Sequence, residues 1–203
     1  MSIFVIGLTG PTGAGKSVAA EIFAQQNIPV INADLVAREV VLPGSRALKM
    51  LCERFSEKIL NPDGTLNRKE LAARAFKDKE STQAINRITH PFIIERINQR
   101  IRELEAKGER AVLIDAPLLF EAEADKFCNT TIAILADINI RLERIIKRDN
   151  ITKQQAIERI KSQKPDDFYR SRADHIIYNN GDLKAFRQSV ANIISKLVYN
   201  NED

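Results

Sequence analysis

The chain has 203 residues, 44% of them hydrophobic and 29% charged, and its 31 basic and 27 acidic side chains leave a net charge of +4. These values are typical of one globular domain with insertions. The mild charge is weak support for a nucleic-acid partner and is fully compatible with polyanionic small-molecule substrates, so charge alone decides nothing. Our prediction for the partners is small-molecule substrates and no nucleic acid. The apolar run over residues 3–8 is too short for a signal sequence or a membrane span, and the distant Cys52 and Cys128 imply no disulfide framework. We therefore expect a cytoplasmic protein without a membrane partner, as a monomer or a small homo-oligomer.

Five short runs rich in valine, isoleucine and leucine have the pattern of buried strands. They are residues 3–8, 29–32, 111–116, 131–136 and 174–178. Helical patterns lie between them, so the sequence predicts an α/β fold in three layers, with a five-stranded parallel sheet between helices.

The crossover between the second and third strands is unusually long. Residues 34–108 have the pattern of several helices, with breaks expected at Pro43-Gly44, in the turn over residues 61–64 and at His90-Pro91. So much helix between two strands indicates an inserted helical subdomain. Because no linker separates it, we expect a lobe of a single domain spanning residues 1–203.

The first strand leads into Gly10-Pro-Thr-Gly-Ala-Gly-Lys-Ser17, a complete G-x-x-x-x-G-K-[ST] phosphate-binding loop before a helix. Its glycines allow backbone N–H groups to converge, and the helix N-terminus adds positive charge at the same point. Lys16 would reach the β- and γ-phosphates, and the Ser17 hydroxyl would bind Mg²⁺. An ordinary glycine-rich turn is the alternative, which the strand before and the helix after disfavour. The residues expected to bind the nucleotide here are Gly10, Thr12, Gly13, Ala14, Gly15, Lys16, Ser17 and Val18.

Asp34 directly follows the second predicted strand, at the edge of the sheet where open α/β folds bind ligands. It could face the phosphate loop and accept the proton of an attacking hydroxyl, or orient that hydroxyl and a Mg²⁺-bound water. The alternative is an N-cap for a helix over residues 35–41. The spacing alone does not decide between them.

Arg141, Arg144 and Arg148 have the spacing of one helical face and are candidates for a lid that closes on the transferred phosphoryl group. A solvated helix with ion pairs to Glu143 is the alternative. The basic stretch over residues 159–172, which contains Gln163, either completes the lid or is only surface.

Two further positions carry weaker signals. Asp115 ends the third strand in the form of a Walker B carboxylate, a pattern of low specificity. Asn180 and Gly181 lie in the turn after the fifth strand, where they could contact adenine, although a plain turn is the alternative.

A phosphate loop alone does not define the reaction. The chain has no Asn-Lys-x-Asp guanine signature, and its length holds only one nucleotide domain, which disfavours GTPases and large ATP-driven machines. Small-molecule kinases remain, since they need an acceptor-side carboxylate, a substrate lobe and an arginine-rich lid.

Several strings beyond the loop are specific to one family. The most notable are Thr89-His90-Pro91 and Pro117-Leu-Leu-Phe-Glu121, and the helix ending in Arg148-Asp149 also matches that family. With them the chain resembles the dephospho-coenzyme A kinases over nearly its whole length. That resemblance implies an ATP-dependent phosphorylation of the ribose 3′-hydroxyl of dephospho-CoA to give CoA, the last step of CoA biosynthesis, and a fold like the nucleoside monophosphate kinases.

The resemblance also implies roles for particular residues. It makes Asp34 the expected base, with Lys16, Arg141 and Arg144 as catalytic cations, residues 34–108 as the CoA-binding lobe and 138–172 as the lid. The core is then 1–33, 109–137 and 173–203. The expected substrate-binding residues are Asp34, Arg38, His90, Pro117 and Leu118.

Two departures from the family pattern limit the transfer. Asn32 stands where the family usually has an aspartate, and Pro11 in the loop cannot donate a backbone hydrogen bond. Two other functions remain as alternatives: a kinase for another hydroxylated metabolite or nucleotide, and a protein that binds nucleic acid or a partner with ATP as a switch.

Overall fold

The computed structural model describes residues 2–75 and 78–199. It divides into two compact units, one formed by Met1–Ile31 with Leu104–Asp203 and the other by Asn32–Glu103. We call these the sheet unit and the helical unit. The boundaries of the helical unit lie close to those of the predicted insert, while the assignment of core, insert and lid within a single domain stays a prediction.

The sheet unit is built on five strands in the order β2-β3-β1-β4-β5. The strands are β1 (Phe4–Thr9), β2 (Val30–Asn32), β3 (Ala111–Asp115), β4 (Thr130–Leu135) and β5 (His175–Tyr178). Strand β1 pairs in parallel with both β3 and β4, and β4 pairs in parallel with β5. All five predicted strands are present, with bounds that differ by one residue, and the predicted α/β fold is confirmed.

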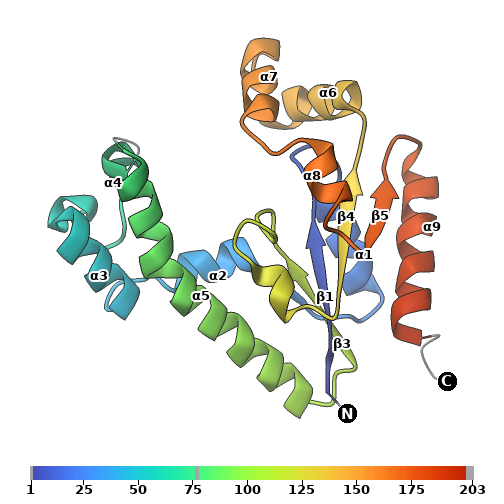
Figure 1. Ribbon diagram of the computed structural model, residues 1–203, viewed down its shortest axis with the longest axis horizontal. Helices are drawn as coiled ribbons and strands as arrows, with labels where there is room; N and C mark the ends of the chain where they lie inside the picture. The colour runs from blue at the N-terminus through green and yellow to red at the C-terminus, as the bar shows by residue number, and fades with distance from the viewer. Residues whose placement is uncertain (1, 76–77, 200–203) are drawn as a thin grey trace. The chain divides into compact units, whose positions relative to one another are not determined.

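Two helices cover one face of this sheet: α1 (Lys16–Gln25) and α9 (Leu183–Ile194), which continues as a π-helical turn over Ser195–Tyr199 (Figure 1). Phe23 of α1 and Val190 of α9 are fully buried in one core with alternate side chains of the central strands. On Gly7 of β1, a Cβ atom would lie 2.8 Å from both Leu119 and Cys128, so the segment between β3 and β4 packs closely there. Burial raises the pKa of the Cys128 thiol to about 12.

Three helices follow β4 in the chain. They are α6 (Ile138–Asp149), α7 (Lys153–Lys161) and α8 (Asp166–Arg170), and the short 3₁₀ helix Ala124–Phe127 precedes β4. Helix α6 ends at Asn150 in the left-handed conformation, and Thr152 with Gln155 forms a capping box that starts α7. In Figure 1, α6 and α7 lie beyond the arrowheads of β1 and β4, the end of the sheet at which the phosphate loop begins.

The helical unit has its own apolar core, formed around Leu51, Phe55 and Leu71. Its helices are α2 (Ala33–Glu39), α3 (Arg46–Phe55), the 3₁₀ helix Glu57–Ile59, α4 (Arg68–Ala75) and α5 (Lys79–Ala106), whose last turn belongs to the sheet unit. The helices are interrupted at Pro43-Gly44 and at the turn over residues 61–64, as the sequence predicts.

The break expected at His90-Pro91 is wrong, because α5 continues through Pro91. A proline inside a helix removes one backbone hydrogen bond and costs about 3 kcal/mol. Here apolar side chains on both sides of the proline, Ala84 and Ile88 before it and Phe92 after it, pack in the same core and offset that cost. Local sequence signals do not contain this tertiary contribution.

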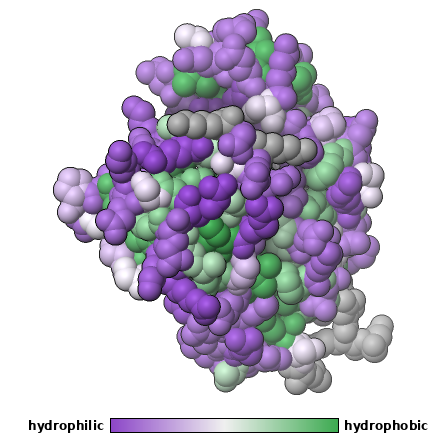
Figure 2. Space-filling model, turned by 60° about the vertical axis from the view of Figure 1, so that its left-hand side comes forward, coloured by the Kyte–Doolittle hydropathy of each residue, from purple (hydrophilic) through white to green (hydrophobic). Residues whose placement is uncertain are grey.

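Within residues 2–75 and 78–199, no helix is long and apolar enough to cross a membrane. The face in Figure 2 is mostly hydrophilic, with smaller hydrophobic areas between the hydrophilic side chains.

Candidate active site

The phosphate loop connects β1 to α1 and passes very close to the neighbouring strand β4. Gly10 has a φ of 147°, and a Cβ atom at this position would lie 2.3 Å from the Ile134 carbonyl oxygen. Only glycine fits this approach, which brings the loop directly over the carboxyl end of the sheet.

Donors from outside the loop hold three of its successive carbonyl groups. Arg141 Nε donates to the Thr12 oxygen (3.0 Å), Arg144 donates to the Gly13 oxygen (3.3 Å), and Asn179 Nδ2 donates to the Ala14 oxygen (2.8 Å). Arg144 also donates to the backbone oxygen of Asn179 at 3.1 Å, which links the two supports. Helix α6 and the residue after β5 therefore support the loop conformation through its carbonyl groups.

The N-terminus of α1 is open to an anion. Its N-cap is Gly15, which has no side chain to bond the first-turn N–H groups, and no acidic residue lies in the first turn. Lys16 and Ser17 begin the helix, so an ammonium, a hydroxyl and the positive helix end are grouped together.

A cavity of about 750 Å³ opens over the loop. Four cations line it: Lys16, Arg144, Lys147 and Arg148. The other residues that line it are Gly10, Pro11, Thr12, Gly13, Gly15, Ser17, Val18, Pro117 and Gln163. The volume is that of a small-molecule site. The described residues of its wall carry four positive charges and no negative one, which fits a polyphosphate.

The ammonium of Lys16 contacts the Asp115 carboxylate at the end of β3. The parallel register that pairs Leu8 with Asp115 places this carboxylate beside the start of the loop. Both side chains are largely shielded, with 15% of Lys16 and 6% of Asp115 exposed. The weak sequence signal at Asp115 thus marks a residue that holds the loop lysine.

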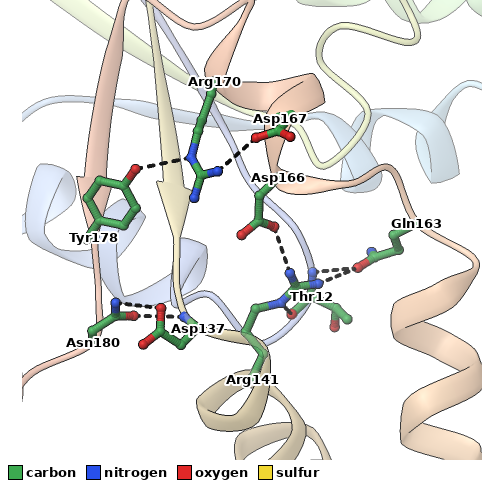
Figure 3. A network of polar contacts seen from close by, with 9 residues as sticks. All are labelled: Thr12, Asp137, Arg141, Gln163, Asp166, Asp167, Arg170, Tyr178 and Asn180. Carbon is green, nitrogen blue, oxygen red and sulfur yellow. Dashed lines mark hydrogen bonds and ion pairs between the residues drawn. The ribbon is translucent and has the colours of Figure 1, made fainter.

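The three arginines of α6 share one face, as their spacing predicts, because each contacts a residue of the loop. Arg148 donates to Thr12 Oγ1 at 3.4 Å, the longest of these contacts. Arg141 is 4% exposed and also donates to Asp166 of α8 at 3.0 Å (Figure 3). The alternative of a solvated helix face is therefore wrong for Arg141. Burial lowers the pKa of its guanidinium, and the Asp166 carboxylate acts in the opposite direction.

The family model for dephospho-CoA kinase matches residues 4–185. The chain belongs to the dephospho-CoA kinase family. It is similar to the dephospho-CoA kinase of Corynebacterium glutamicum, with 38% identity over 95% of this chain and 96% of that one. It is likewise similar to that of Listeria monocytogenes, with 38% identity over 96% of this chain and 98% of the relative. The solved structure of dephospho-CoA kinase from Campylobacter jejuni superposes with a TM-score of 0.74 at 27% identity, covering 97% of this chain and 98% of that chain.

A bidentate ion pair orients Arg148 at the wall of the cavity. Asp149 accepts from Arg148 Nε at 2.7 Å and from its terminal nitrogen at 2.9 Å, and Arg159 of α7 contacts the same carboxylate. These hydrogen bonds, Arg148 first, lower the pKa of Asp149 to about 2. The carboxylate therefore stays charged at neutral pH and joins α7 to the arginine helix.

Some residues predicted for the site do not line the cavity. Ala14 is a loop residue whose side chain is buried, and Gly181 is exposed in the turn after β5. Asn180 bonds instead with Asp137: its Nδ2 donates to the carboxylate, and its Oδ1 accepts from the Asp137 N–H, both at 2.8 Å (Figure 3). Leu118 is 62% exposed, next to Pro117.

Sequence reasoning missed Asn179 as a supporting residue. The sequence pattern points to the next asparagine, Asn180, whereas Asn179 is the one that is 6% exposed and donates to the Ala14 carbonyl of the loop. Alternation offers a signal in retrospect: Ile177 and Asn179 are buried, whereas Tyr178 and Asn180 are exposed. A buried asparagine side chain needs partners, which the Ala14 carbonyl of the loop and Arg144 supply.

The remaining predicted residues lie in the helical unit. Asp34 and Arg38 are exposed, one turn apart on α2, and His90 is half-buried on α5. The N-cap of α2 is Asn32, whose side chain accepts from the Leu35 N–H at 3.0 Å. The alternative of Asp34 as the helix cap is therefore wrong, and its carboxylate is available for another role.

Alanine at Gly15 should damage the loop more than alanine at another left-handed glycine. Gly15 has a φ of 108°, and its Cβ would lie 2.2 Å from Asn179 Nδ2, whereas Gly108, with a φ of 81°, has no atom within 4 Å of that position. We expect Gly108→Ala to cost about 1 kcal/mol of unfolding free energy, and Gly15→Ala about 3 kcal/mol, because Asn179 must also leave Ala14. Denaturant unfolding measures both, and equal costs would contradict the close approach.

Proposed function

We propose that this chain transfers the γ-phosphoryl group of ATP to the ribose 3′-hydroxyl of dephospho-CoA, forming CoA and ADP. The observation that carries the proposal is the four-cation cavity over a complete phosphate loop, in a chain of the dephospho-CoA kinase family. The cavity supports ATP binding, and the family supports the acceptor.

In this proposal the loop and the start of α1 hold the phosphates of ATP. The uncapped N–H groups of the first helical turn donate to phosphate oxygens, while Arg144, Lys147 and Arg148, which also line the cavity, provide charge. Lys16 reaches the γ-phosphoryl group and shares its ammonium between Asp115 and the phosphate. Phosphoryl transfer needs such positioning and charge stabilisation more than covalent help from the protein.

We further propose Mg²⁺ as a companion of ATP, held by the Ser17 hydroxyl. Among the residues that the structure describes, no group of three or more His, Cys, Asp or Glu side chains could hold a metal ion. One hydroxyl at the cavity wall, together with phosphate oxygens and water, suits Mg²⁺, which keeps several waters and binds protein through few groups. The ion would neutralise charge on the β- and γ-phosphates.

On the acceptor side, Asp34 is the proposed general base. Its exposed carboxylate is not used as a helix cap, and it follows the end of β2 by two residues. It would accept the proton from the 3′-hydroxyl as the oxygen attacks phosphorus. The proposed acceptor contacts are Arg38, His90, Pro117 and Leu118, and the helical unit is the proposed CoA-binding lobe.

The burial of Arg141 changes the role that we propose for it. Its guanidinium is bonded to Thr12 and Asp166 and does not line the cavity. We propose that Arg141 positions the loop, and that Arg144 and Arg148 are the lid cations that contact phosphate. The adenine contact of Asn180 and Gly181 stays a proposal. It requires either that the Asn180–Asp137 hydrogen bonds break or that backbone groups of these two residues contact the adenine.

A coupled ADP-release assay tests the function. With Mg-ATP, we expect release with dephospho-CoA and none with adenosine, AMP or no acceptor, and CoA as the product by mass spectrometry. Release with a different acceptor only would favour a kinase for another metabolite.

We also propose a cytoplasmic enzyme that acts as a monomer or small homo-oligomer without nucleic acid or membrane partners. The unpaired cysteines Cys52 and Cys128 support a reducing compartment. Light scattering of the purified protein gives its oligomeric state, and a gel shift with RNA and DNA tests for the alternative of an ATP-switched nucleic-acid binder.

A further inference from the structure

The side chain of Gln163, between α7 and α8, joins the phosphate loop to the cavity. Its Oε1 accepts from the Thr12 N–H at 2.9 Å and from the Arg141 guanidinium at 3.4 Å. Figure 3 shows both contacts ending on this one oxygen. A backbone N–H and a guanidinium can only donate, so the oxygen of the amide must face them and the NH₂ group must face away.

The hydrogen-bond donors of the Gln163 NH₂ group are not used by these contacts. Gln163 lines the cavity, and its Nε2 makes no hydrogen bond to any residue within 2–75 or 78–199. An amide NH₂ can bind only an acceptor. In a cavity lined by Lys16, Arg144, Lys147 and Arg148, the ligand that supplies acceptors is an anion rich in oxygen.

We propose that Gln163 is a nucleotide-binding residue whose Nε2 donates to a phosphate oxygen of ATP, while its Oε1 holds Thr12 and Arg141. The Thr12 N–H is occupied by Gln163 and does not point at phosphate, and the same side chain returns a donor to the cavity. The segment between α7 and α8 then senses the nucleotide directly. This inference rests on the proposed function, because it takes ATP as the occupant of the cavity.

Two substitutions separate this role from a purely structural one. Gln163→Glu keeps an acceptor for Thr12 and Arg141 but replaces the donor by a negatively charged oxygen. Gln163→Met keeps the length and removes both functions without a change of charge. If Gln163 donates to phosphate, isothermal titration with Mg-ATP should give a Kd about tenfold weaker for the methionine variant and about 100-fold weaker for the glutamate variant. If Gln163 only braces the loop, the glutamate variant should bind like the wild type and better than the methionine variant, and that order would overturn the proposal.

Titration at high salt distinguishes a direct contact with phosphate from long-range charge repulsion between the carboxylate of the Gln163→Glu variant and ATP. At 1 M KCl the screening length is about 3 Å, so repulsion without contact would largely vanish. The glutamate variant should still bind ATP more weakly than the methionine variant, and a reversal of their order at high salt would overturn a direct contact. Gln188→Glu on α9 makes the same charge change on an exposed side chain bonded to Asn192, and it should leave ATP affinity unchanged.

The wild type in the same titrations separates the two proposals. If it fails to bind Mg-ATP or to form CoA, the proposed function fails. If it does both and Gln163→Glu binds ATP as well as the wild type does, only the inference on Gln163 fails. Circular dichroism melting of each variant shows that affinity is compared between folded proteins.

Discussion

Lys16→Ala should lower kcat about 10³-fold with dephospho-CoA as acceptor, because the ammonium is the only cation of the described cavity wall that belongs to the loop itself and would meet the transferred phosphoryl group. The effect should exceed that on ATP affinity, since Arg144, Lys147 and Arg148 also line the cavity and would still bind the nucleotide in the proposed complex. Steady-state kinetics with saturating ATP measure it. Lys184→Ala, an exposed lysine on α9, is the control and should leave kcat unchanged.

The ion pair with Asp115 adds a stability effect that must be separated from catalysis. Removing Lys16 takes the ammonium away from a carboxylate that is only 6% exposed, so the alanine variant should also lose stability. In the double variant Lys16→Ala/Asp115→Asn the carboxylate charge is gone. Stability should recover there while kcat stays low. Recovery of kcat along with stability would show that Lys16 supports the fold and not the reaction.

The parts of the site that the sequence predicts are those encoded by neighbouring residues. Runs of β-branched residues mark the strands, and the glycine spacing with Lys16 and Ser17 marks the loop, because each is a property of one short segment. The spacing of the α6 arginines likewise places them on one face. These local patterns account for the fold class and for most of the cavity wall.

The parts that escape prediction depend on contacts between distant segments. The Thr12–Gln163 hydrogen bond spans 151 positions and the Asn179–Ala14 bond spans 165. Arg141 is buried and donates to Asp166, which lies 25 positions away in the sequence, and this contact distinguishes a residue that supports the loop from a mobile lid cation. The periodicity of hydrophobic residues does not show which distant residues come into contact. The continuous helix through Pro91 is unpredicted for the same reason, because its tertiary packing outweighs the local effect of the proline.

The site combines a locally encoded motif with contacts from distant segments. A generic loop motif provides the N–H groups and Lys16, and supports remote in sequence set its geometry: α6 through its arginines and the turn after β5 through Asn179. Substitutions at those supports should therefore alter nucleotide binding although the motif itself is intact. The proposed role of Asp34 concerns the acceptor and not the nucleotide, so it can be tested independently of the loop.

Asp34→Asn should lower kcat by about 10²- to 10⁴-fold, the range for loss of a general base, and leave ATP affinity nearly unchanged. The amide keeps the size of the side chain but cannot take up the proton of the 3′-hydroxyl. Asn32 caps α2, so the substitution should not destabilise the helix. Asp63→Asn makes the same change on an exposed turn of the helical unit and should leave kcat unchanged.

The split between kcat and ATP binding decides the role of Asp34. A base acts on the acceptor, so only the chemical step should slow, as single-turnover kinetics with preformed ATP complex would show. Equal losses in kcat and in ATP affinity would indicate that Asp34 orders the site or its metal ion. Full activity of the asparagine variant would leave deprotonation to solvent, as is feasible where the transition state is loose and the attacking hydroxyl loses its proton late. If both proposals hold, an exposed carboxylate, Asp34, takes part in the chemical step, and a buried cation, Arg141, only maintains the geometry of the loop.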